Sequence, residues 1–188
     1  MTAQNTQTLK ILITGGCGFI GSALIRHIIS LTSHQVINLD KLTYAANPLS
    51  LSSVQDNKRY HFIQGDICDD KLVNSVFEQY QPNVVMHLAA ESHVDRSITD
   101  PLAFVRTNVI GTVNLLNAFR DTWKDNFEGK RFYHISTDEV YGTLGATGLF
   151  EETTSYDPNS PYSASKAAAE MIVMSYIESF NMNIKIVR

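Results

Sequence analysis

The sequence has 188 residues, of which 44% are hydrophobic, and its formal net charge is -4 at pH 7. This size and composition suit one globular domain, and the scattered lysines and arginines form no basic stripe of the kind that binds nucleic acid. No apolar run approaches the roughly 18 residues of a membrane helix, and the polar start Met1 to Thr8 is unlike a secretory signal or transit peptide. We therefore expect a soluble cytoplasmic protein without a nucleic-acid or membrane partner.

The sequence contains only two cysteines, Cys17 and Cys68. They make no disulfide framework, and neither has another Cys or a His at metal-ligand spacing. We therefore expect a reducing compartment, two small apolar cysteines and no metal site.

Short apolar runs rich in Ile, Val and Phe alternate with longer segments of helical period, which predicts strand–helix units on a parallel sheet. Six strands are expected, at Lys10 to Thr14, Gln35 to Leu39, Tyr60 to Gln64, Val84 to Ala89, Arg131 to Ser136 and Ile184 to Val187. Four helices are expected, at Phe19 to Leu31, Lys71 to Tyr80, Pro101 to Trp123 and Pro161 to Phe180, and the polar segment 41–58 has room for a short one. Right-handed connections then give the strand order 3-2-1-4-5-6 of a doubly wound α/β sheet, the Rossmann fold.

The segment ITGGCGFIGS follows the first predicted strand and opens the first helix, with Gly15, Gly18 and Gly21 in a G-x-x-G-x-x-G spacing. Glycines here permit a tight turn, a close approach of the backbone to a pyrophosphate and close helix–strand packing, and the helix N-terminus favours phosphate charge. An ordinary turn and cap is the alternative. The strand before, the helix after and an acidic residue beyond favour a dinucleotide site.

That acidic residue is Asp40, at the end of the second strand, where a carboxylate accepts hydrogen bonds from ribose hydroxyls and repels a 2'-phosphate. NAD is therefore expected rather than NADP, although the neighbouring Lys41 weakens this distinction. Asp66 ends the third strand at a similar position, and it suits either an adenine contact or a strand-end cap. Cys17, inside the glycine loop, is expected to fill space.

The segment SPYSASK places Tyr162 and Lys166 four residues apart at the start of a helix, with Ser160 as N-cap and Pro161 in the first position. This spacing puts both side chains on one face, where the ammonium is expected to favour the phenolate and lower the pKa of Tyr162. An exposed Tyr–Lys pair on an ordinary helix is the alternative, but beside a dinucleotide fold we expect a catalytic pair.

STDEVYG, from Ser136 to Gly142, puts Thr137, Asp138 and Glu139 at the end of an apolar strand. In a regular strand the two carboxylates would point to opposite faces, so both reach one site only if the strand ends or twists there. A paired acid and base is what elimination of water from a sugar requires. The alternative is that both carboxylates are solvent-facing loop charges.

The glycine loop, Asp40 and the Tyr–Lys pair make the chain resemble the extended short-chain dehydrogenase/reductases, whose third catalytic position falls on Thr137. The strings GGCGFIGS, LDKLTYA, GDICD, HLAAESHVDRSI, TNVIGT, STDEVYG and SPYSASKAA are similar, in order, to the bacterial dTDP-glucose 4,6-dehydratases. Related 4-epimerases lack the Asp–Glu pair. The resemblance covers the whole chain but only about the first half of a family member.

The resemblance implies an NAD-dependent lyase. Tyr162, partnered by Lys166, takes the 4-hydroxyl proton as hydride leaves C4 for NAD, while Thr137 binds that oxygen. Glu139 then takes the C5 proton, Asp138 protonates the leaving C6 hydroxyl, and the stored hydride returns to C6. Cofactor contacts are implied at Gly15, Gly18, Phe19, Ile20, Gly21, Asp40, Lys41, Leu42, Thr43, Asp66, Ile67, Leu88, Ala89, Ala90, Glu91, Ser92, Thr107, Tyr162 and Lys166. Ser92 and Thr137 are implied to lie near the sugar.

The resemblance also implies a homodimer formed by the helices 101–123 and 161–180. The chain stops at Arg188, where the sixth predicted strand ends. We therefore expect residues 1–188 to be the NAD-binding Rossmann domain that carries the catalytic residues, with the C-terminal substrate-binding domain absent.

Several alternatives remain open at this point. UDP-glucose or GDP-mannose are competing substrates, because Ala46 and KAAAEM depart from the usual family strings. A nucleotide-binding module without turnover is a second possibility for the chain as given. His93, Asp95 and Arg96 suit either a substrate contact or a loop network, and His87, between apolar neighbours, is expected to be a hydrogen-bonded core histidine.

Overall fold

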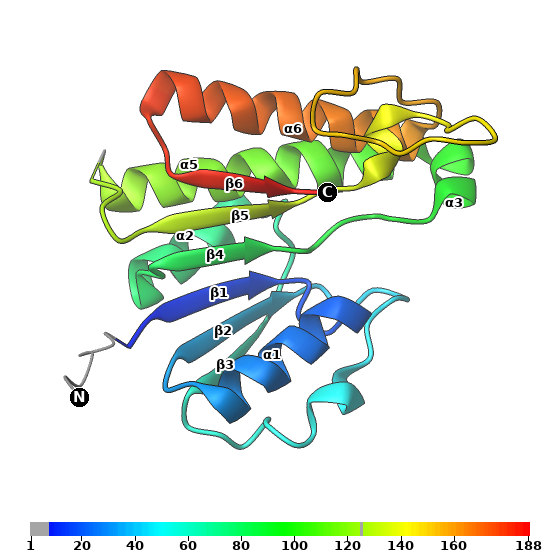
Figure 1. Cartoon of the computed structure of the whole chain (residues 1–188). Coiled ribbons are helices and arrows are strands. Elements are labelled where there is room, and N and C mark those ends of the chain that lie inside the picture. Colours follow the sequence, from blue (N-terminus) through cyan, green and yellow to red (C-terminus); the bar gives the residue numbers. More distant parts are fainter. Residues whose placement is uncertain (1–7, 125) are drawn as a thin grey trace, which may run out of the picture.

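A computed structural model describes residues 8–124 and 126–188. Its centre is a six-stranded parallel sheet in the order β3-β2-β1-β4-β5-β6 (Figure 1), which confirms the predicted topology. The strands are β1 (Lys10–Thr14), β2 (Gln35–Asp40), β3 (Tyr60–Gln64), β4 (Val84–His87), β5 (Arg131–Ile135) and β6 (Ile184–Val187).

Two strands end earlier than predicted, β4 at His87 rather than Ala89 and β5 at Ile135 rather than Ser136. One backbone hydrogen bond continues beyond each of these strand ends. The Leu88 N–H donates to the Thr14 carbonyl (3.1 Å), and the Ser136 N–H donates to the Val187 carbonyl (2.7 Å). The chain then leaves the sheet, so the residues after β4 and β5 form a rim above its carboxyl edge.

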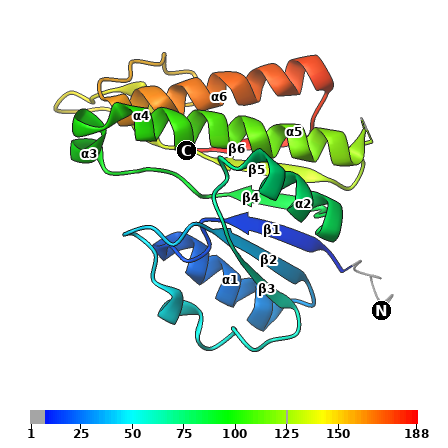
Figure 2. The same cartoon turned by 180° about the vertical axis from the view of Figure 1, so that it is seen from behind.

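Helices cover the sheet unequally. Figures 1 and 2 show α1 on one face and α2, α5 and α6 on the other. The helical segments are α1 (Phe19–Leu31), η1 (Pro48–Leu51), α2 (Asp70–Tyr80), α3 (Val94–Thr99), α4 (Pro101–Phe104), η2 (Val105–Ile110), α5 (Gly111–Trp123), η3 (Asp138–Tyr141) and α6 (Pro161–Phe180). No helix within the described residues combines the length and apolar character needed to cross a bilayer.

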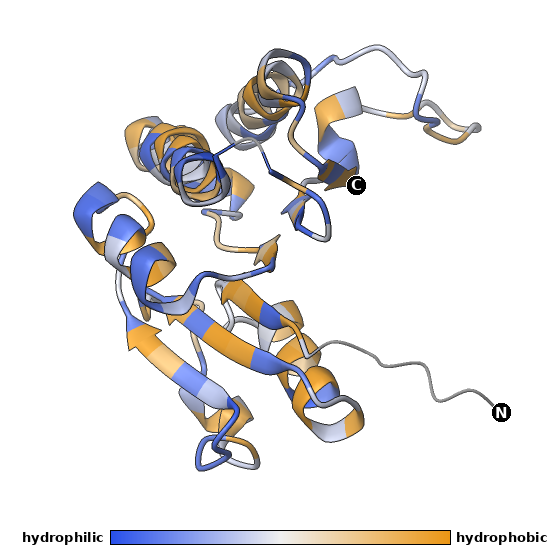
Figure 3. Cartoon of the chain, turned by 90° about the vertical axis from the view of Figure 1, so that its left-hand side faces the viewer, coloured by the Kyte–Doolittle hydropathy of each residue, from blue (hydrophilic) through white to orange (hydrophobic). Residues whose placement is uncertain are grey.

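Strand periodicity divides the interior into two cores. In β1, Leu12 faces a core with α2, α5 and α6, while Ile11 and Ile13 face a second core with α1. This alternation follows from the two-residue repeat of side chains along a strand. Figure 3 shows hydrophobic residues concentrated along the central strands, as a sheet covered on both faces requires.

The predicted helix 101–123 is not one regular helix. It contains a π-helical segment, η2, between α4 and α5. Within it, Asn108 is 2% exposed and hydrogen-bonds the backbone of Glu91 and the hydroxyl of Ser165. Such wide turns are set by tertiary contacts and frequently occur at functional sites, so apolar spacing alone could not reveal this one.

The start of α6 agrees with its predicted caps. The Ser160 hydroxyl accepts from the Ser163 N–H (3.0 Å), the Ser163 hydroxyl accepts from the Ser160 N–H (3.0 Å), and Pro161 occupies the first turn. These contacts satisfy backbone donors that a helix start leaves unpaired. They fix the first turn, which carries Tyr162.

Candidate functional site

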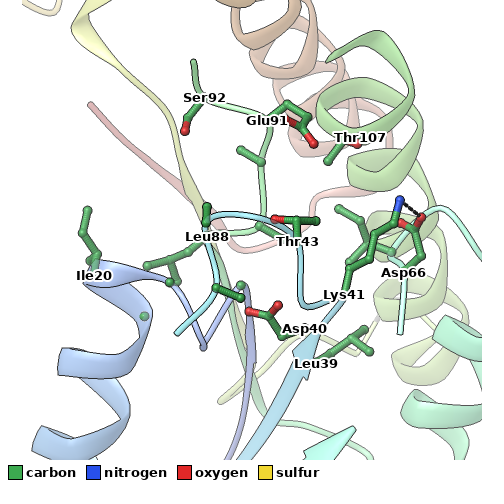
Figure 4. A pocket seen from close by; sticks show the side chains of 18 of the residues that line it. Ile20, Leu39, Asp40, Lys41, Thr43, Asp66, Leu88, Glu91, Ser92 and Thr107 are labelled. Atoms are coloured by element: carbon green, nitrogen blue, oxygen red, sulfur yellow. Dashed lines mark ion pairs between the residues drawn. The ribbon is translucent and has the colours of Figure 1, made fainter. Parts of the chain in front are cut away.

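A cavity of about 370 Å³ lies at the carboxyl edge of the sheet. Figure 4 shows side chains from the start of α1, from the end of β2, from the segments after β3 and β4 and from η2 converging on it. It is lined by Gly15, Gly18, Phe19, Ile20, Gly21, Leu39, Asp40, Lys41, Thr43, Ala45, Ala46, Gly65, Asp66, Ile67, Leu88, Ala89, Ala90, Glu91, Ser92, Thr107 and Ile135. Its size suits a small-molecule or cofactor site.

The glycine loop forms one wall because side chains would not fit there. Gly15 has φ +73°, and a Cβ on it would lie 2.7 Å from the backbone nitrogen of Ala89. A Cβ on Gly21 would lie 2.3 Å from the carbonyl oxygen of Gly15. No side chain caps α1 at Gly18, so its first-turn N–H groups are available to an anion.

Asp40 is held rigidly on the cavity floor. Its carboxylate accepts from the backbone N–H of Cys17 (2.8 Å) and of Leu42 (2.8 Å), and it is 8% exposed. These bonds join the glycine loop to the end of β2, which fixes the carboxylate beside both. Cys17 itself is buried in the α1 core, as expected for a space-filling residue.

Lys41 forms an ion pair with Asp66 across the cavity rim, with Nζ 2.7 Å from Oδ2 (Figure 4). Asp66 also accepts from the Cys68 N–H (2.9 Å), a local strand-end turn. Burial raises the pKa of Asp66, but the bonds to Lys41 and Cys68 outweigh it and leave that pKa lowered. Asp66 therefore both lines the cavity and caps the strand end.

The opposite wall is organised by Asn108, which the sequence reasoning missed. Its side-chain oxygen accepts from the Glu91 N–H and its amide donates to the Glu91 carbonyl, both at 2.9 Å. Figure 4 shows Glu91, Ser92 and Thr107 together on this wall. A polar residue inside the otherwise apolar helix pattern of TNVIGT was the available signal.

The expected cofactor residues fall into two groups. Every one of them lines the cavity except Leu42, Tyr162 and Lys166. Leu42 adopts φ +58° and packs against the α1 core instead, because its N–H is held by Asp40. The sequence reasoning did not single out Leu39, Ala45, Gly65 or Ile135, which also line the cavity. These residues carry no polar side chain that would mark them in the sequence, and strand ends and loop geometry place them at the cavity.

The expected catalytic residues lie on two segments beside this cavity. The Lys166 Nζ donates to the carbonyl of Ile135 (2.6 Å), a residue that lines the cavity. Thr137, Asp138 and Glu139 follow, and the Thr137 hydroxyl accepts from the Glu139 N–H (3.2 Å) at the start of η3. The strand therefore ends before Asp138 and Glu139, which is the condition for both carboxylates to reach one site. Both side chains are exposed.

The electrostatics of Tyr162 differ from the expectation. Its pKa is raised, chiefly by burial and further by the charges of Glu139 and Asp138, while the Thr137 hydroxyl opposes the change. Lys166 does not lower that pKa, because its ammonium is directed at the Ile135 carbonyl. The sequence-based pKa prediction for Tyr162 was therefore wrong.

Lys166 is itself buried, at 4% exposure. Burial lowers the pKa of Lys166 to about 8, and the negative charge of Glu170 opposes this change. A buried ammonium is disfavoured unless nearby acceptors compensate. Lys166 therefore titrates within reach of neutral pH.

His87 is a buried, hydrogen-bonded histidine, as predicted. Its ring nitrogens contact the hydroxyls of Thr14 (2.8 Å) and Thr112 (3.0 Å), and burial lowers the pKa of His87 to about 3. His93, Asp95 and Arg96 instead belong to the unpredicted helix α3 or its N-cap. Arg96 lies over the Tyr44 ring at 4.0 Å, so part of that segment packs against the loop after β2.

Sequence comparison supports the resemblance seen in the motifs. A dTDP-glucose 4,6-dehydratase of Neisseria meningitidis serogroup B is 56% identical over 178 residues, which cover 92% of this chain and 50% of that protein. A dTDP-glucose 4,6-dehydratase of Salmonella typhimurium is 53% identical over 190 residues, covering 93% and 52%. The chain thus spans about half the length of these relatives.

Solved structures give the same fold. DesIV, a dTDP-glucose 4,6-dehydratase from Streptomyces venezuelae with NAD and TYD bound, has a TM-score of 0.87 and 38% identity, over 95% of this chain and 54% of that one. A UDP-glucose 4-epimerase from Thermus thermophilus in complex with NAD has a TM-score of 0.84 and 30% identity, over 96% and 54%. The fold therefore accommodates both dehydratases and epimerases.

A family model gives the assignment. The model described as GDP-mannose 4,6 dehydratase matches residues 12–188, from the first strand to the last residue of the chain. This range contains the glycine loop, the residues after β5 and the start of α6. The chain accordingly belongs to the GDP-mannose 4,6 dehydratase family.

Proposed function

We propose that the protein containing this chain dehydrates dTDP-glucose to dTDP-4-keto-6-deoxyglucose with NAD. The observation that carries the proposal is the placement of Thr137, Asp138 and Glu139 one residue beyond β5, whose last residue, Ile135, accepts a hydrogen bond from Lys166. The acid–base pair thereby follows within four residues of Ile135, which lines the cavity. The dTDP-glucose dehydratase relatives add support for this nucleotide sugar.

NAD fits the cavity better than NADP. Asp40 presents a carboxylate whose two backbone hydrogen bonds hold it in place, which suits ribose hydroxyls and opposes a 2'-phosphate. Lys41, the cation that could have held such a phosphate, is paired with Asp66. The uncapped start of α1 and the glycine loop, which brings backbone close, suit a pyrophosphate.

When bound, NAD would accept a hydride from C4 of the sugar and return it to C6. The chain's own residues move the protons. Tyr162 removes the 4-hydroxyl proton while Thr137 binds that oxygen; Glu139 then removes the C5 proton, which the 4-ketone makes acidic, and protonated Asp138 donates to the leaving C6 hydroxyl. Glu139 returns its proton to C5 as the hydride reaches C6. Residues 1–188 would thus supply the NAD-binding and catalytic part of the activity.

The test is a mass assay on the complete protein encoded by the parent gene, with NAD and, in separate reactions, dTDP-glucose, UDP-glucose or GDP-mannose. We expect dTDP-glucose to give a product lighter by one water, without net NADH. A preference for another nucleotide sugar would correct the substrate. A product of unchanged mass but altered C4 configuration would indicate an epimerase, and NAD binding without any product would contradict turnover.

The two carboxylates have separable roles. Asp138→Asn should slow water loss by about 100-fold or more, since it removes general acid catalysis, while leaving reduction of NAD by dTDP-glucose within about threefold. Single-turnover absorbance would then show NADH accumulating before product forms. Glu151→Gln, in the exposed loop that follows, is the control, and equal loss of both steps in Asp138→Asn would contradict this division of labour.

We also propose a homodimer in which the surface of α4, η2 and α6 is covered by a second copy. Large apolar side chains on these segments face solvent: Leu102 is 67%, Val105 43%, Ile110 47% and Met171 47% exposed. Such a run at helical spacing is typical of an interface. Its location matches the two helices that the family resemblance implied.

A further inference from the structure

Glu170 is a buried carboxylate for which neither the cavity nor the proposed proton transfers gives a role. It lies on α6, one turn beyond Lys166, and is 0% exposed. It accepts hydrogen bonds from the Ser136 hydroxyl, from the Tyr156 hydroxyl (2.7 Å) and from the Arg188 Nε (2.9 Å). A buried carboxylate is costly unless it is paired in this way, and these three donors supply that pairing.

One of these contacts acts at the end of β5. Ser136, bonded to Glu170, directly precedes Thr137, Asp138 and Glu139. The preceding carbonyl, that of Ile135, accepts from Lys166. Two successive turns of α6 therefore hold two successive residues, Ile135 and Ser136, one residue before the proposed acid and base.

The ion pair with Arg188 reaches the far side of the same segment. The Arg188 guanidinium lies 5.4 Å from the Tyr141 ring centroid and 5.6 Å from that of Tyr156. Tyr141 ends η3, the short helix that carries Asp138 and Glu139. Glu170 is thus connected to the start of the carboxylate-bearing segment through Ser136 and to its end through Arg188.

We propose that Glu170 is a positioning residue that fixes the carboxylates after β5 relative to Tyr162 and Lys166 on α6. The inference rests on the proposed dehydration. One buried side chain thereby connects the two parts of the proposed catalytic group, the residues after β5 and the Tyr–Lys pair on α6. A displacement of about 1 Å between such halves can cost roughly 100-fold in rate.

Glu170 also acts on Lys166 through its charge. The groups that face this ammonium are Glu170 on α6, His134 on β5 and His87 on β4. Burial lowers the pKa of both histidines, so they add no positive charge at neutral pH. Glu170 is then the charge that counters the burial of Lys166, and its removal should lower the pKa of Lys166 further.

The test compares Glu170→Gln, Ser136→Ala and their double variant with wild type in the complete protein. We expect each single change to lower kcat for dehydration by roughly 10- to 100-fold with KM altered by less than about threefold. The double variant should have a kcat little lower than that of Glu170→Gln, because both substitutions disrupt the same contact between Ser136 and Glu170. Glu170→Asp should recover part of kcat, and Glu178→Gln, exposed on the same helix, should match wild type.

Two readouts separate positioning from simple stability. In Glu170→Gln the basic limb of the pH profile should move to lower pH, together with the Lys166 titration followed by NMR of labelled lysine. Ser136→Ala keeps the negative charge of Glu170, so it should leave the Lys166 titration unchanged. It should, however, speed hydrogen exchange of the Glu139 and Gly142 amides, which are hydrogen-bonded within this segment.

The outcomes are decisive in either direction. A Glu170→Gln protein that loses thermal stability but keeps kcat, the pH limb and amide protection would overturn the proposal. If Glu170→Gln does not fold, a Ser136→Ala protein with unchanged kcat and amide protection would do the same. If wild type shows no turnover, the proposed function fails, while the lysine titration and hydrogen exchange still decide the role of Glu170.

Discussion

Lys166 illustrates how burial changes what a residue pair can do. Spacing on a helix brought it to the same face as Tyr162, but the fold directs its ammonium to the Ile135 carbonyl and keeps it 4% exposed. The pKa of Tyr162 is consequently raised and that of Lys166 is lowered to about 8. Each shift comes from the depth of the site, which side-chain spacing does not encode.

The lowered pKa of Lys166 predicts how stability depends on pH. The folded value of about 8 lies below the ordinary value of 10.5, so between these values the unfolded chain binds more protons than the folded one. Stability contributed by this group therefore rises with pH across the window. As the pH rises from about 8 to 10.5, the free energy of unfolding of wild type should increase by up to about 3 kcal/mol relative to that of Lys166→Met.

Urea unfolding at a series of pH values measures this difference. Lys185→Met, at an exposed position on β6, is the matched control. The difference in free energy of unfolding between wild type and this variant should not change with pH over the same window. A difference between wild type and Lys166→Met that stays flat over the window would mean that Lys166 is not destabilised by burial in the folded protein.

At the scale of elements, the glycine loop joins β1 to α1 with backbone in contact where side chains would otherwise lie. Gly21→Ala would place a Cβ 2.3 Å from the Gly15 carbonyl oxygen and push the helix start away from the loop. We expect NAD binding to weaken at least about tenfold, a loss of roughly 1.4 kcal/mol, when measured by calorimetry.

Gly145→Ala is the control for this substitution, since a Cβ there meets nothing within 4 Å. It should bind NAD as wild type does. Unchanged affinity in Gly21→Ala would show that the close contact between loop and helix is not needed for the dinucleotide.

At the scale of the whole molecule, the exposed apolar surface of α4, η2 and α6 should decide assembly. Leu102→Glu places a charge on a side chain that is 67% exposed in the single chain and that the proposed dimer buries. Burying an unpaired charge is strongly unfavourable, so sedimentation of the complete protein should shift from dimer to monomer.

Leu149→Glu provides the comparison, because Leu149 is 87% exposed on the loop before α6 and lies outside the proposed interface. This variant should sediment as wild type does. A Leu102→Glu protein that remains dimeric would place the interface on another surface.

The sequence alone determined the order of the six strands and of the main helices between them, the strand topology, the glycine loop, the caps of α6 and the family resemblance. These features depend on local periodicity, on spacing within a few residues and on the handedness of connections. The same local rules correctly gave the end of β5 as the place where Asp138 and Glu139 leave the sheet.

Only the tertiary structure decided the π-helical turn at Asn108, the direction of the Lys166 ammonium, the pKa shift of Tyr162 and the Glu170–Arg188 ion pair. Each depends on groups brought together from distant parts of the chain: Asn108 meets Ser165, and Glu170 meets Ser136. Their energies come from burial and three-dimensional proximity, and neither quantity is fixed by the identity of neighbouring residues.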